Sequence, residues 1–137
     1  MTVNAYLNFN GNCAEAFAYY QKVLGGEIPM SVTMGQAPGG EENANDRDKI
    51  MHTRLVLPGG NVIMGSDAPG HYYTQPAGFS VSITVDGPEE GKRIFDALAD
   101  GGQVRMAFDK TFWAEGFGMA IDKFGTPWMV NAGMTPF

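Results

Sequence analysis

The chain has 137 residues and a formal net charge of −6, with 44% hydrophobic and 12% aromatic residues. This composition is typical of a folded globular protein of one domain's size and excludes a disordered chain. The acidic balance and the scattered Lys and Arg residues argue against nucleic acid or an anionic membrane as a partner. The single cysteine, Cys13, excludes an internal disulfide, and together with the absence of a signal-like N-terminal segment it favours a cytoplasmic location.

The first part of the chain predicts a strand followed by an amphipathic helix. Apolar and polar residues alternate over residues 5–9, as in a half-buried strand. Asn12 is placed to cap a helix, whose apolar stripe recurs at steps of three and four residues and ends at Gly25-Gly26. Residues 27–34 predict a strand whose early proline favours a sheet edge. A long polar loop, residues 35–48, and a hairpin, residues 50–65, follow.

The second part of the chain repeats this pattern. Residues 81–85 alternate, a helix starts at Pro88 and closes at Gly101-Gly102, and residues 104–108, 118–122 and 127–131 predict three further strands. The glycine pairs are 101 − 25 = 76 residues apart, and the matching hairpin glycines, Gly60 and Gly125, are 65 residues apart. The repeat predicts two β-α-β-β-β modules in one domain, residues 1–66 and 79–137, with a junction at 67–78.

Three segments resemble the PhnB-like branch of the glyoxalase/bleomycin-resistance/dioxygenase (vicinal oxygen chelate) superfamily, namely "YLNFNGNCAEAFAYYQKVLGGE", "HTRLVLPGGNVIMGSD" and "DKFGTPWMVN". The resemblance implies an α+β fold in which helices lie outside curved mixed sheets that line a cup. It also implies a homodimer, often with modules exchanged between chains. Some members of this branch carry the label demethylubiquinone methyltransferase. This sequence lacks the glycine-rich loop and following acidic residue of a nucleoside-cofactor site.

The metal enzymes of this superfamily have one ligand on the first and one on the last strand of each module, and those ligands are His, Gln or Glu. Carried over by strand alternation, the four positions in this chain are Asn4, Met64, Ser80 and Met129. An amide, a hydroxyl and two thioethers are poor ligands for hard or borderline divalent metals. We therefore expect no metal and no other cofactor.

The inner strand faces predict a site for a small-molecule ligand. Its predicted ligand-binding residues are Asn4, Tyr6, Asn8, Met64, Ser80, Ser82, Met129 and Trp113. His52 and Tyr6 are candidate catalytic residues, although a hydrogen-bonded structural histidine also explains His52. For Trp113, stacking on a planar ligand and a structural role in the core or a dimer interface are equally good explanations, and we expect Asp122 to be solvated.

Two hypotheses follow from these residues. The first is a metal-independent protein that binds a small, partly aromatic molecule, as bleomycin-resistance proteins do. The second is a lyase or isomerase of the same superfamily, acting on an unknown small molecule.

Overall fold

The structure is a computed structural model that describes residues 1–40 and 45–135. It divides into two compact units, a first unit of Met1–Thr74 and a second unit of Gln75–Phe137. The boundary between them lies within residues 67–78, the stretch that separates the two sequence repeats. The elements in chain order are β1 (Ala5–Phe9), α1 (Cys13–Leu24), β2 (Glu27–Thr33), η1 (Met34–Gln36), β3 (Ile50–Val56), β4 (Val62–Asp67), η2 (Gly70–Tyr72), β5 (Val81–Val85), α2 (Pro88–Ala99), β6 (Gln103–Asp109), β7 (Ala114–Ile121) and β8 (Pro127–Met134).

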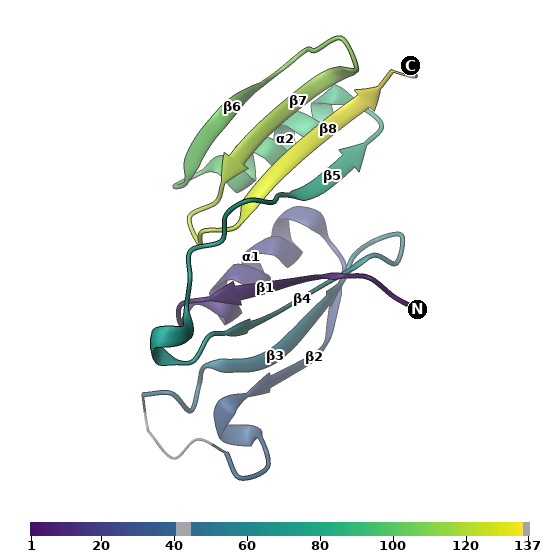
Figure 1. The fold of residues 1–137 in the computed structure, drawn as a ribbon. Helices are drawn as coiled ribbons and strands as arrows, with labels where there is room; N and C mark the ends of the chain where they lie inside the picture. The colour runs from purple at the N-terminus through teal and green to yellow at the C-terminus, as the bar shows by residue number, and fades with distance from the viewer. Residues whose placement is uncertain (41–44, 136–137) are drawn as a thin grey trace. The chain divides into compact units, whose positions relative to one another are not determined.

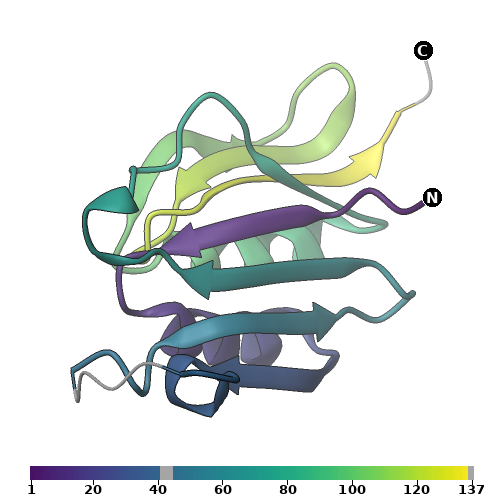
Figure 2. The same cartoon turned by 60° about the horizontal axis from the view of Figure 1, so that its bottom comes forward.

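Each unit contains one four-stranded sheet with a helix on one face (Figure 1). The strand order is β1-β4-β3-β2 in the first unit, shown from a second direction in Figure 2, and β5-β8-β7-β6 in the second. The pairs β1–β4 and β5–β8 are parallel, and the other neighbours are antiparallel. Both units therefore show the predicted β-α-β-β-β pattern with the same mixed topology. As Pro29 predicted, β2 is an edge strand.

In the first unit, α1 packs on the sheet over a glycine. Leu7 and Phe9 are buried while Tyr6 and Asn8 are exposed, so the predicted alternation of β1 is confirmed. Leu7 is the Cα partner of Gly65 on β4. A Cβ added to Gly65 would lie 2.6 Å from Cε1 of Phe17 on α1, closer than two carbon atoms pack. The Phe17 ring therefore lies where Gly65 has no side chain.

In the second unit, the corresponding glycines are on a different strand. A Cβ added to Gly118 on β7 would lie 2.5 Å from Cε1 of Phe95 on α2. Gly116, two residues earlier on the same face, leaves room in the same way for the Phe108 ring of β6. The helix aromatics Phe17 and Phe95 are 78 residues apart, two more than the 76-residue repeat of the glycine pairs. The helix aromatic therefore does not occupy the same repeat position in the two units. In the first unit it packs over a glycine of β4, and in the second over a glycine of β7.

The start of α1 is held by a carboxylate from β4 rather than by the expected cap. Asn12 occupies the N-cap position but makes no side-chain cap hydrogen bond. The backbone N–H of Cys13 instead donates to Asp67 Oδ1 at 3.0 Å, and the N–H of Ile50 donates to Asp67 Oδ2 at 2.8 Å. The prediction for Asn12 was wrong because a buried negative charge from a distant strand binds the helix N-terminus more strongly than a local amide. Burial, followed by the Asp67 carboxylate, raises the pKa of the Cys13 thiol.

Several boundaries differ from those predicted. Strand β7 begins at Ala114, four residues before the predicted start at 118, and β8 continues to Met134. The predicted loop 35–48 overlaps the short helix η1, which begins with a capping box formed by its N-cap Thr33 and Gln36. Residues 41–44 of the predicted loop lie outside the described residues. Within the described ranges, no helix is both long and apolar enough to span a bilayer.

We expect Gly118→Ala to destabilise the second unit, because the added methyl group would collide with the Phe95 ring. Overpacking of this kind costs about 1–3 kcal/mol of unfolding free energy. Urea denaturation of the purified variant measures the loss. Gly87→Ser is the control, because a Cβ at Gly87 meets nothing within 4 Å, its φ is −119°, and serine is favoured at the N-cap of α2 that Gly87 occupies. Equal losses in the two variants, or none in Gly118→Ala, would show that the glycine is not required by packing.

Candidate functional site

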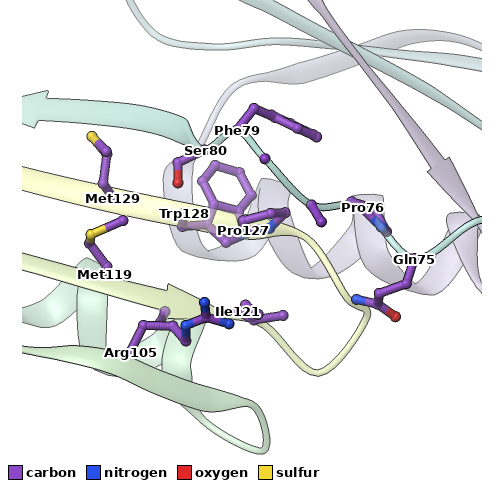
Figure 3. Close-up of a pocket in the computed structure, with 13 residues that line it drawn as sticks. Gln75, Pro76, Phe79, Ser80, Arg105, Met119, Ile121, Pro127, Trp128 and Met129 are labelled. Carbon is purple, nitrogen blue, oxygen red and sulfur yellow. The ribbon is translucent and has the colours of Figure 1, made fainter.

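The second unit contains a pocket of about 540 Å³ on the sheet face opposite α2, which we call the open face. Residues from β6, β7 and β8 form its walls, and the segment that precedes β5 closes one side (Figure 3). Thirteen residues line it: Gln75, Pro76, Ala77, Gly78, Phe79, Ser80, Arg105, Met119, Ala120, Ile121, Pro127, Trp128 and Met129. Its volume is in the range of small-molecule sites, roughly 300–1,000 Å³.

Strand register places two methionines together in this pocket. Met119 on β7 and Met129 on β8 are Cα partners, and Met129 is also the partner of Ser82 on β5. Because Gly118 faces α2, its neighbour Met119 faces away from the helix. Figure 3 shows the two thioether side chains next to each other, with Ser80 beyond Met129. Flexible, polarisable thioethers form an apolar surface that adapts to the shape of a ligand.

The Trp128 side of the pocket is fixed by a buried carboxylate. Trp128 Nε1 donates to Asp122 Oδ2 at 2.7 Å. Asp122 Oδ1 accepts the backbone N–H groups of Phe124 at 2.9 Å and Thr126 at 3.0 Å. Asp122 is only 3% exposed, so the prediction that it is solvated was wrong. The tight turn between β7 and β8 surrounds the carboxylate, so that three N–H groups of the protein donate the hydrogen bonds that water would otherwise supply.

In the first unit, the sheet face opposite α1, which is that unit's open face, carries a pair of hydrogen-bonded side chains. The Tyr6 hydroxyl on β1 and His52 Nδ1 on β3 are 3.0 Å apart, and the hydrogen bond has either group as donor, depending on the His52 tautomer. The two rings are 5.6 Å apart between centroids at an interplanar angle of 21°. Met64, between them on β4, is the Cα partner of Tyr6 and of Arg54. The structure therefore brings the two catalytic candidates into direct contact.

The predicted ligand-binding residues are distributed over three places. Ser80 and Met129 line the pocket, and Ser82 lies on the same face, where its hydroxyl accepts a hydrogen bond from Asn131 Nδ2 at 3.3 Å. Trp113 lies at the other end of β7 and packs edge-on against Phe112 and Phe117, at centroid distances of 4.9 and 5.2 Å. The remaining four belong to the first unit, with Asn4 exposed just before β1, and Tyr6, Asn8 and Met64 on its open face.

Sequence reasoning identified Ser80 and Met129 but missed the other pocket residues, namely the segment 75–79, Arg105, Met119, Ala120, Ile121, Pro127 and Trp128. Met119 could have been found from the strand alternation, because it is the direct cross-strand partner of the predicted Met129. Arg105 carries no such signal. It is an extra residue in a bulge of β6, with no partner on β7. The alternation of buried and exposed residues along a strand gives no indication of where such a bulge lies.

The four positions that the superfamily uses for metal ligands do not fit a divalent metal here. Asn4, Met64, Ser80 and Met129 supply an amide, a hydroxyl and two thioethers, with no imidazole or carboxylate. Among residues 1–40 and 45–135, no three His, Cys, Asp or Glu side chains are grouped so as to hold a metal ion.

We expect dialysis against EDTA to leave the melting temperature of the purified protein unchanged. The reason is that a metal adds binding free energy to folding only where ligands hold it, and the four positions supply no ligand suited to a divalent metal. Differential scanning calorimetry before and after dialysis measures the effect, and addition of Zn²⁺ or Ni²⁺ serves as the reverse test. Stoichiometric metal in the untreated protein, together with a lower melting temperature after EDTA, would show that other residues bind a metal.

Comparisons with known proteins give consistent matches along the chain. A family model described as 3-demethylubiquinone-9 3-methyltransferase matches residues 2–131. Protein YjdN of Escherichia coli (strain K12) is 38% identical over 140 residues, covering 96% of this chain and 95% of the relative. Among solved structures, protein PA1353 from Pseudomonas aeruginosa is 45% identical, with a TM-score of 0.87 and coverage of 96% of this chain and 97% of that chain.

A more distant structure shows the fold class. The glyoxylase/bleomycin resistance protein/dioxygenase domain from Frankia sp. EAN1pec matches with a TM-score of 0.69 at 13% identity, over 100% of this chain and 94% of that chain. The predicted α+β fold with two βαβββ modules is thereby confirmed. The ligand-binding roles of the named residues, the homodimer and the absence of nucleic-acid and membrane partners stay predictions.

Proposed function

We propose that this chain, which belongs to the family described as 3-demethylubiquinone-9 3-methyltransferase, binds a small, partly aromatic molecule in the pocket of its second unit without using a metal. Membership of this family agrees with the predicted resemblance to the PhnB-like branch. The observation that carries the proposal is the pocket itself. The thioethers of Met119 and Met129 on its floor favour a planar apolar body, because thioethers make good contacts with aromatic rings.

The methyltransferase activity in the family's description is not part of this proposal. A methyl transfer needs a bound methyl donor, and the sequence lacks the glycine-rich loop and acidic residue that commonly hold a nucleoside cofactor. The pocket instead offers mainly apolar surface and a few polar groups, such as the Ser80 hydroxyl. This combination suits recognition of a single small molecule.

The repeat supplies a matched pair of variants that tests the proposal. Met129 and Met64 occupy equivalent positions, each paired with the first strand of its sheet, but only Met129 lines the pocket. We expect Met129→Trp to fill the pocket and weaken binding of 2-naphthol, an uncharged aromatic probe, by about tenfold or more, corresponding to at least about 1.4 kcal/mol. Met64→Trp should leave the affinity unchanged.

Isothermal titration calorimetry measures both affinities. Mass spectrometry of small molecules released from the untreated protein adds an independent measurement. Absence of 2-naphthol binding to the wild-type protein, or equal losses in the two folded variants, would contradict the proposed pocket.

One observation favours a second candidate function, an isomerase or lyase that moves a proton. The hydrogen bond between Tyr6 and His52 places a group that can accept a proton beside a phenol that can donate one. Tyr6 is 43% exposed, so a substrate can reach the pair from solvent. In this mechanism, the imidazole removes a proton from a carbon next to a carbonyl group, and the phenol stabilises the enolate oxygen.

The two histidines of the chain allow a direct test of this second function. If His52 acts as a general base, the wild-type protein in D₂O should speed the exchange of the C3 protons of phenylpyruvate for deuterium, as followed by proton NMR. Loss of a positioned base lowers a rate by roughly 10²–10⁴-fold, so His52→Gln should reduce exchange to the buffer rate. His71→Gln is the control, because His71 is exposed in η2 and contacts Tyr72 rather than Tyr6. Exchange that is no faster than buffer, or equal in both variants, would exclude the base.

A further inference from the structure

The pocket of the second unit contains a single charged residue. Of the thirteen residues that line it, Arg105 is the one basic residue, and none is an aspartate or glutamate. This lining is unusual for a chain with fifteen acidic and nine basic residues. A ligand in the pocket therefore meets one positive charge and no opposing negative charge from the pocket wall.

The Arg105 side chain has no partner among the described residues. By contrast, Lys49, Lys92 and Arg93 form ion pairs with Asp46, Asp96 and Glu90, respectively, at distances of 2.7–2.8 Å. No described residue makes a hydrogen bond, ion pair or ring contact with the Arg105 guanidinium. Its donors are therefore available to a ligand without first breaking a contact to any of the described residues.

A β-bulge gives Arg105 its position. Val104 is the Cα partner of Ala120, and Met106 is the partner of Met119, so Arg105 is an extra residue with no partner on β7. The first unit has an equivalent bulge, where Ile28 and Pro29 lie between the pairs Glu27–Val56 and Met30–Arg54. Bulges change the direction of a side chain at the edge of a sheet and are frequent beside binding sites.

From these observations, we propose that the pocket selects an aromatic carboxylate, whose carboxylate group binds the Arg105 guanidinium while its ring contacts Met119 and Met129. This inference rests on the proposed binding function and specifies its ligand class. Figure 3 shows Arg105 on the strand beside Met119, so that charge and apolar surface adjoin. A planar guanidinium matches a carboxylate with two parallel N–H···O hydrogen bonds, which a neutral ligand cannot accept with equal strength.

The experiment compares 2-naphthoate with its neutral analogue 2-naphthamide, which has the same ring system and nearly the same size. Titration calorimetry at neutral pH and low salt measures both affinities for the wild-type protein, Arg105→Gln and Arg105→Lys. Arg54→Gln is the control, because it removes the same charge from an exposed arginine of the first unit. Far-ultraviolet circular dichroism and the melting temperature verify that each variant is folded.

We expect the wild-type protein to bind 2-naphthoate at least about fivefold more tightly than 2-naphthamide, with a preference that falls as salt rises. Arg105→Gln should abolish that preference without changing 2-naphthamide affinity, Arg105→Lys should retain part of it, and Arg54→Gln should retain all of it. Equal wild-type affinities for the two probes, or a preference unchanged in Arg105→Gln, would overturn the carboxylate inference while leaving the binding function intact. Binding of neither probe would overturn both.

Discussion

The structure of each unit depends on close packing between a helix aromatic ring and a sheet position that has no side chain. Phe17 packs over Gly65 in the first unit, and Phe95 packs over Gly118 in the second. Close approach of helix and sheet determines which residues of each strand face the helix. Because strand residues alternate, the same contact determines which residues lie on the open face of the sheet. The open faces are thus a consequence of packing on the other side of each sheet.

Much of the fold could be predicted because the sequence pattern of a β-α-β-β-β module occurs twice in the chain. The alternation of 5–9 and 81–85, the glycine pairs and the repeated hairpin together predicted both modules, with Tyr6 and Met129 pointing away from the helices. Local patterns identify such features because they depend on residues close together in the chain. The cap of α1 could not be predicted in this way, since its carboxylate, Asp67, lies 54 residues away from Cys13.

The candidate site was less predictable than the fold, for reasons that differ between residues. Tyr6 and His52 were each identified, but their contact depends on the β1-β4-β3 strand order, which brings together residues 46 positions apart. Asp122 looks like an exposed turn residue, and only the Trp128 indole and two backbone N–H groups reveal it as buried. Arg105 was missed because a bulge adds one residue without any change in composition.

Both β2 and β6 contain a bulge, and at a bulge the identity of the side chain does not affect the register of the sheet. An extra residue has no cross-strand partner, so its replacement does not alter the pairing of its neighbours. The two units already hold very different residues there, Pro29 in the first and Arg105 in the second, within the same pattern of flanking pairs. A charged, polar or apolar residue can therefore occupy this position while the pairing of the sheet stays the same.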